Sequence, residues 1–212
     1  MMSFASMVRR RALQSALAFA AITLQWRRAS ADAAAVAPIR EPCDSLLGIM
    51  RAGRGTPFPR RFDMLAPAIE RALDLATILQ LSVGPSWSSL PAADHNTLLT
   101  AFRRYTIANY VNSFDNYTGQ RFDVQPETRA LPNGEQLVQT KIISSSGESH
   151  ELDYVMRQGA GWKAVDVLAD GSISRVAVQR SDFRRLMSSG GARALIESLN
   201  QKTSDLSGGA LS

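Results

Sequence analysis

The 212-residue sequence contains little of the side-chain chemistry on which enzymes usually depend. It has one cysteine, Cys43, and two histidines, His95 and His150, which lie far apart in the chain. A single cysteine excludes an intramolecular disulfide, and the sequence holds no paired-cysteine spacing, HExxH motif, Walker loop or Rossmann glycine fingerprint. These absences exclude the common metal, nucleotide and nucleophile–base sites. We therefore predict that the protein is not an enzyme and needs no metal or cofactor.

Long hydrophobic runs are also missing. No stretch reaches the length of about 20 apolar residues that a transmembrane helix needs. The longest candidate, residues 12–24, follows the arginines at 9–11 and precedes a small-x-small pattern. This order is typical of a secretory signal peptide, so we expect residues 1–33 to be a signal peptide cleaved near residues 31–33. The arginines at 27–28 interrupt the pattern and leave an uncleaved anchor as the alternative.

The positive charge of the chain is concentrated in this leader. The net charge is +5, but the first 33 residues carry five arginines and one acid, Asp32, which amounts to +4. The remaining chain is therefore close to neutral, at about +1. We expect no nucleic-acid partner, because such partners require a basic surface on the folded domain.

The N-terminal half of the remaining sequence favours helices. Residues 34–39 are expected to form a flexible lead-in, followed by a short helix over residues 44–50. Asp63 and Asp74 are predicted N-caps of the next two helices. Pro91 is a favourable start for a long helix that reaches about Tyr117.

An aromatic stripe marks this long helix. Phe102, Thr106, Tyr110 and Phe114 recur at every fourth residue and therefore share one helix face. Such a face either packs into an ordinary core or forms one wall of an apolar cavity. Tyrosine suits a cavity mouth, because its ring packs on apolar groups while its hydroxyl stays in contact with water.

From Gly119 onward the pattern changes to period two, which is typical of strands. Four strands joined by short turns predict an antiparallel meander, and Ser181–Asp182 is the predicted start of C-terminal helices. The fold class is therefore α+β, with the N-terminal helices and the long helix packed on a twisted four-stranded sheet, as in NTF2- or cystatin-like folds. One domain is expected over residues 34–204, with a flexible tail at 205–212.

Several short motifs occur in a fixed order in the second half of the chain. They are Tyr117-x-Gly119-Gln120-x-Phe122, Leu152-Asp153-Tyr154, Trp162-Lys163-x-x-Asp166-Val167, Asp170-Gly171-Ser172-Ile173-Ser174 and Gln179-Arg180-Ser181-Asp182-Phe183. The ordered set resembles the MlaC family of periplasmic lipid-binding proteins, the toluene-tolerance or auxiliary transport component group. Within it, the last two motifs are most similar to the hopanoid-associated HpnM branch.

This resemblance implies a soluble periplasmic carrier that binds phospholipid or hopanoid in an apolar cavity. It implies a shuttle between inner and outer membranes, with an inner-membrane ABC transporter complex and an outer-membrane lipoprotein complex as partners. The expected lipid-binding residues are aromatic or apolar positions, together with one threonine, on the long helix, the loop after it and the strands. They are Phe102, Thr106, Tyr110, Phe114, Tyr117, Val138, Ile142, Tyr154, Met156 and Trp162.

Two alternatives remain open from the sequence. The first is an NTF2-like exported enzyme that acts on an isoprenoid or steroid-like substrate, with Asp153, Asp166 or His150 as its acid or base. A structural ion pair, with Arg157, Lys163 or Arg175 nearby in sequence, is the favoured interpretation of the two aspartates, since a buried carboxylate needs a partner. The second alternative is a periplasmic adaptor that binds no ligand.

Overall fold

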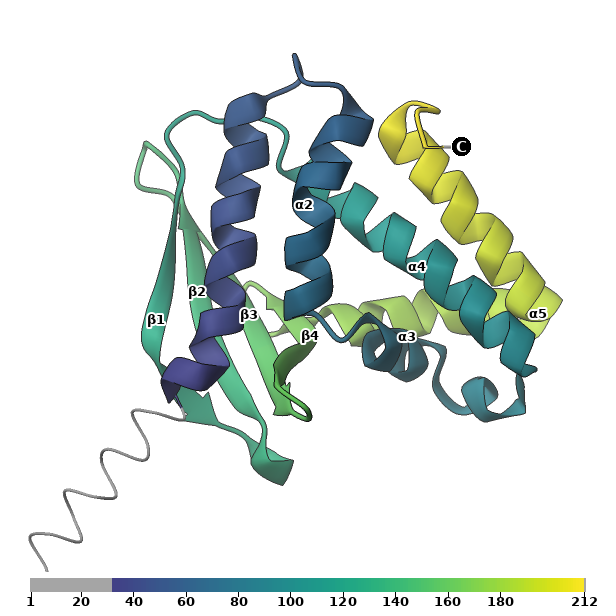
Figure 1. The fold of residues 1–212 in the computed structure, drawn as a ribbon. Coiled ribbons are helices and arrows are strands. Elements are labelled where there is room, and N and C mark those ends of the chain that lie inside the picture. Colours follow the sequence, from purple (N-terminus) through teal and green to yellow (C-terminus); the bar gives the residue numbers. More distant parts are fainter. Residues whose placement is uncertain (1–31, 212) are drawn as a thin grey trace, which may run out of the picture.

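A computed structural model describes residues 32–211, and shows helices packed on one face of a twisted sheet (Figure 1). Residues 1–31 of the predicted signal peptide, which covers residues 1–33, lie outside the described residues. No helix in the described part of the chain is long and apolar enough to cross a membrane.

The first element is a helix over residues 32–52, called here the N-terminal helix. It places Ala35, Val36 and Ile39 in the core, so the predicted flexible lead-in at 34–39 is wrong. Pro38 and Pro42 weaken the local preference for a helix. Packing against the sheet overrides this weakness, because most helix stability in proteins comes from the buried apolar face.

Three short elements follow: α2 (Phe58–Ala72), α3 (Leu75–Val83) and the 3₁₀ helix η1 (Gly84–Ser89). Asp63 lies inside α2, whose N-cap is Pro57, so the predicted cap at Asp63 is wrong. The predicted cap at Asp74 is confirmed, because its carboxylate accepts a hydrogen bond from the Thr77 N–H at 3.0 Å.

The long helix α4 spans Ala92–Ser113, with Pro91 as its N-cap. Its start agrees with the prediction, but it ends four residues before Tyr117. Phe114 is the C-cap, and its non-helical backbone (φ −118°, ψ 59°) turns the chain toward the sheet.

The sheet contains β1 (Arg121–Ala130), β2 (Gln136–Ile143), β3 (Ser149–Gln158), β4 (Trp162–Ala169) and β5 (Ile173–Ser174). The strands follow each other in space in chain order, and neighbours are antiparallel. The α+β class and the meander are confirmed, but the count of four strands is wrong. A two-residue strand has no period to detect, and β5 forms only because the turn at Asp170–Gly171 returns the chain to β4. The NTF2-like assignment stays a prediction.

The last helix, α5 (Arg175–Ser207), begins earlier than predicted. Ser174 is its N-cap, and its hydroxyl accepts a hydrogen bond from the Ala177 N–H at 2.9 Å. Ser181 and Asp182, the predicted start, lie inside the helix. Gly191 (φ 63°, ψ −153°) bends α5, and the part after the bend returns alongside α4 (Figure 1). Residues 205–207 of the expected tail are therefore helical.

Candidate functional site

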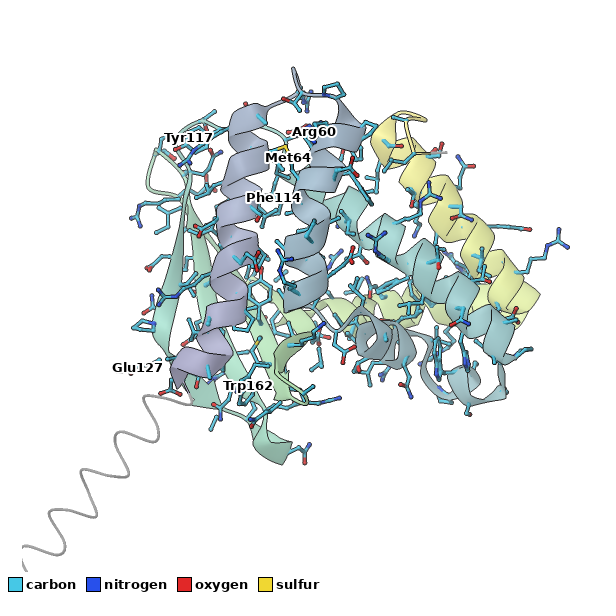
Figure 2. The ribbon with its side chains drawn as sticks, viewed as in Figure 1. Arg60, Met64, Phe114, Tyr117, Glu127 and Trp162 are labelled. Carbon is cyan, nitrogen blue, oxygen red and sulfur yellow. The ribbon has the colours of Figure 1, made fainter. Side chains whose placement is uncertain are left out.

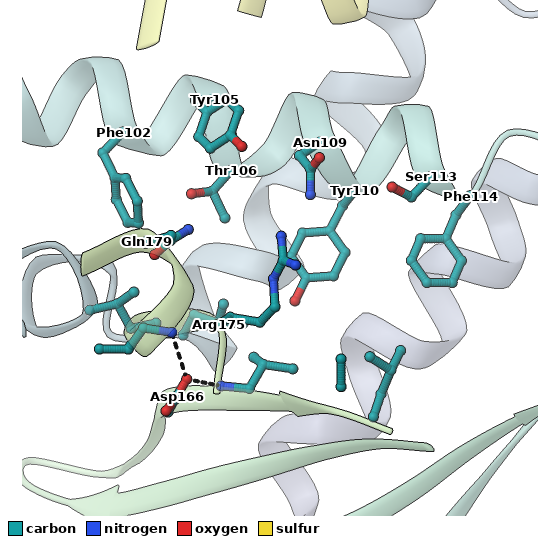
Figure 3. A pocket seen from close by; sticks show the side chains of 16 residues that line it. Phe102, Tyr105, Thr106, Asn109, Tyr110, Ser113, Phe114, Asp166, Arg175 and Gln179 are labelled. Carbon is teal, nitrogen blue, oxygen red and sulfur yellow. Dashed lines mark hydrogen bonds between the residues drawn. The ribbon is translucent and has the colours of Figure 1, made fainter. Parts of the chain in front are cut away.

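A cavity of about 340 Å³ lies between α4, the paired ends of β3 and β4, and the first turns of α5 (Figure 3). This volume falls at the lower end of the range of small-molecule sites, roughly 300–1,000 Å³. The turn between β4 and β5 brings the start of α5 to the sheet edge of this cavity. The site is therefore assembled from segments that are far apart in sequence.

Aromatic side chains of α4 and of its C-cap residue, Phe114, form one wall of the cavity. Phe102, Tyr110 and Phe114 line it, and the Tyr110 and Phe114 rings stack with centroids 6.2 Å apart. Leu152 of β3 and Val167 of β4 lie among the residues that form the opposite wall. The four-residue spacing directs Phe102 and Tyr110 to one face of α4, as the sequence predicted, and Phe114 follows directly after the helix ends.

A buried tyrosine pair lies where α4 meets the sheet. The Tyr110 and Tyr154 hydroxyl groups lie close enough to interact, which links the cavity wall to the core. Burial raises the pKa of Tyr110 to about 12 and raises the pKa of Tyr154 well above its ordinary value. Both phenols are therefore neutral at physiological pH, and neither supplies a general base.

The rest of the lining mixes apolar residues, such as Leu73, Ile78 and Val176, with polar ones. Tyr105, Thr106 and Asn109 come from α4, and Arg175 and Gln179 come from α5 (Figure 3). Burial raises the pKa of the Tyr105 hydroxyl, while the nearby Arg175 cation opposes that shift. The cavity thus combines a largely apolar lining with one cationic side chain, Arg175, and one carboxylate, Asp166.

The predicted ion pairing of the two strand aspartates is wrong, since neither forms an ion pair with any described residue. Asp166 instead accepts hydrogen bonds from the Val167 N–H at 2.8 Å, the Val176 N–H at 3.1 Å and the Ser174 hydroxyl at 2.5 Å. It therefore fixes the start of α5. Asp153 accepts a bond from the Thr140 N–H at 3.2 Å, and burial raises its pKa.

Neither histidine lies in the cavity. His95 stacks on Trp87 with ring centroids 4.1 Å apart, and its Nε2 atom is 3.0 Å from the Trp87 carbonyl oxygen. His150 is exposed on β3, with Nε2 3.6 Å from a Glu148 carboxylate oxygen. Among residues 32–211, no group of three His, Cys, Asp or Glu side chains is arranged to hold a metal ion.

The structure places four of the ten expected lipid-binding residues on the cavity: Phe102, Thr106, Tyr110 and Phe114. Tyr154 does not line the cavity, but it is buried directly behind Tyr110. Their role in binding lipid stays a prediction.

The other five expected residues lie elsewhere. Val138 and Met156 are fully buried in the core, and Ile142 lines an adjoining pocket. Tyr117 and Trp162 lie near opposite ends of the sheet (Figure 2). Tyr117 leaves the stripe because α4 ends at Ser113, and Trp162 lies at the far end of β4 from the cavity.

Sequence reasoning missed the contribution of α5 to the site. Arg175 and Gln179 were not expected there, because the helix was predicted to begin at Ser181. The available signal was Ser174, a favourable N-cap, followed by the apolar residues Val176 and Phe183, which are both buried on one helix face.

Comparison with known proteins relates this chain to a protein family and to a solved structure. The family model described as MlaC protein matches residues 41–201. Among solved structures, a phospholipid-binding protein from Ralstonia solanacearum, in complex with a phospholipid, superposes with a TM-score of 0.69 at 22% sequence identity. The match covers 81% of this chain and 98% of that one, and at this identity it shows a shared fold. No curated protein matches the chain.

Proposed function

Because the chain belongs to the MlaC family, we propose that it binds a phospholipid and holds acyl-chain carbons in the cavity beneath α4. The observation that carries this proposal is the aromatic wall of Phe102, Tyr110 and Phe114 along the cavity. The phospholipid complex of the structurally similar Ralstonia protein supports it.

The energetic reason is the exclusion of acyl chains from water. Each buried methylene group contributes about 0.8 kcal/mol, so even part of one chain supplies substantial affinity. Aromatic and aliphatic side chains provide this burial without any catalytic group.

An adjoining pocket gives the bound lipid further room. It shares Ser113, Phe114, Leu152 and Ala169 with the first cavity. Phe114 follows the last helical residue of α4, so its ring is attached where regular helix geometry ends. Because Phe114 lines both pockets, we expect movement of its ring to extend the path for an acyl chain.

We extend the proposal to an exported carrier that moves lipid between inner and outer membranes. This part is supported by the ordered motifs and by the signal-peptide pattern before residue 34. Hopanoid is the alternative cargo, and the expected partners are an inner-membrane ABC transporter complex and an outer-membrane lipoprotein complex.

The central test fills the cavity from the sheet side. Ala169 lines both pockets, so Ala169→Trp should remove most copurifying phospholipid while the protein remains folded. The measurement is organic extraction of purified protein followed by mass spectrometry, with the melting temperature as the check on folding. Ala160→Trp, in the exposed turn before β4, is the matched control and should retain its lipid.

Undiminished lipid in folded Ala169→Trp protein would show that the acyl chains lie elsewhere. A wild-type protein that carries no lipid and binds none when phospholipid is added would favour the ligand-free adaptor.

A further inference from the structure

Arg175 differs from several other arginines of the molecule in having no acidic partner. Arg54 pairs with Asp115 at 2.7 Å, and Arg157 pairs with Glu135 at 2.7 Å. The Arg175 guanidinium forms no hydrogen bond or ion pair with any residue in 32–211, although it lines the cavity. Its backbone lies at the first position of α5, and its side chain extends toward Tyr110 (Figure 3).

Two uncharged polar groups of α4 face the same space. Thr106 and Asn109 are three residues apart and therefore lie on one helix face. The Thr106 hydroxyl oxygen is buried and finds no hydrogen-bond partner in the described part of the chain. Figure 3 shows the Asn109 amide directed toward the Arg175 guanidinium.

The nearby acidic groups form no ion pair with Arg175 in the described part of the chain. Asp166 also lines the cavity, but its oxygens are occupied by the hydrogen bonds that begin α5. Asp182, seven residues further along α5, lies close enough to raise the pKa of Tyr105. The Gln179 amide is held by the Ser82 hydroxyl at 3.0 Å. Arg175, Thr106 and Asn109 thus retain unused hydrogen-bonding capacity at one place.

We infer that Arg175, together with Thr106 and Asn109, binds the phosphate group of the lipid whose acyl chains occupy the cavity. This inference rests on the proposed function, because it assigns the headgroup end of the same site. A guanidinium presents several N–H donors in a plane that matches phosphate oxygens, and a hydroxyl or amide adds a further donor. The cluster lies beside the aromatic wall, so one ligand with a charged end and an apolar end satisfies both.

The test compares two lipids with identical acyl chains, phosphatidylglycerol and diacylglycerol, which differ in the phosphate-bearing headgroup. Affinities of the purified, delipidated protein are measured by competition against a fluorescent lipid. The wild type should bind phosphatidylglycerol about tenfold more tightly, which corresponds to about 1.4 kcal/mol. Arg175→Gln should reduce this ratio to about one while leaving the diacylglycerol affinity unchanged.

Arg184→Gln is the matched control, because Arg184 is an exposed arginine of the same helix that does not line the cavity. It should keep the wild-type ratio. Circular dichroism and melting temperature confirm that both variants are folded.

The outcomes separate this inference from the proposed function. If Arg175→Gln keeps the preference for phosphatidylglycerol, or if the wild type has none, the phosphate site is wrong while the apolar cavity stands. If the wild type binds neither lipid, both proposals fail. Millimolar inorganic phosphate should leave lipid affinity unchanged, because the free ion lacks the acyl chains. Displacement of lipid by phosphate alone would instead assign the site to the free ion.

Discussion

Cys43 is held in the interior, where only 3% of its surface is exposed. Burial raises the pKa of its thiol to about 12, so very little thiolate exists at pH 8. We predict that an aromatic disulfide reagent such as Ellman's reagent reacts with the native protein far more slowly than with the unfolded chain. The measurement is the thiol reaction rate with and without guanidinium chloride. Equal rates would show that the N-terminal helix exposes Cys43.

The raised pKa of Cys43 also determines how the stability of the protein changes with pH. The unfolded chain ionises Cys43 near its ordinary pKa of 9.0, whereas the folded chain keeps the thiol neutral to about 12. The stabilisation from this group is therefore present below pH 9 and is lost as the pH rises toward 12. Cys43→Ala should remove that part of the alkaline loss, which a series of melting temperatures from pH 7 to 11 can measure.

At the scale of elements, α5 depends on a cap that the sequence pattern placed seven residues too late. Ser174 accepts a hydrogen bond from the Ala177 N–H and donates one to Asp166. We predict that Ser174→Ala lowers the free energy of unfolding by about 1 kcal/mol, a typical loss for an N-cap. Ser181→Ala is the control, and it should be neutral or slightly stabilising because Ser181 is exposed inside the helix. Chemical denaturation gives both values, and an equal or larger loss for Ser181→Ala would refute the helix start at Arg175.

A second prediction at the scale of elements concerns the bend of α5 at Gly191. Gly191 has φ 63° and ψ −153°, a conformation that side chains with a Cβ atom rarely adopt. Gly191→Ala should cost about 1–3 kcal/mol. The same change at Gly48, inside the N-terminal helix with open space around its Cβ position, should stabilise the protein by about 0.5–1 kcal/mol. Opposite signs in urea denaturation support the bend, whereas two gains in stability would contradict it.

At the scale of the whole molecule, lipid and fold are thermodynamically linked. The cavity is built from α4, α5 and the sheet together, so the unfolded chain cannot offer it. A ligand that binds only the native state adds about 2.7 kcal/mol at a concentration of one hundred times its Kd. We predict a rise in melting temperature of roughly 5–10 °C under those conditions. Ala169→Trp should show little rise, and an equal rise in that variant would point to another binding surface.

Local patterns were sufficient for several features of this protein. The spacing of Phe102, Thr106, Tyr110 and Phe114 predicted a single helix face, and these four side chains line the cavity. The cap at Asp74 and the antiparallel meander were predictable for the same reason: each depends on residues close in sequence. Helix and strand periods express which side of an element is apolar, and this preference is a local property.

Tertiary structure alone decided the other features. Residues 32–39 are helical despite Pro38 because Ala35, Val36 and Ile39 find an apolar surface to pack on. The two-residue strand β5 exists because β4 supplies its partner, and the turn between them brings Arg175 opposite α4. In the sequence alone, Arg175 is simply one of many arginines and lies near the end of a strand. Its position beside the aromatic stripe depends on the path of the chain between α4 and α5, and that path is set by packing between distant segments.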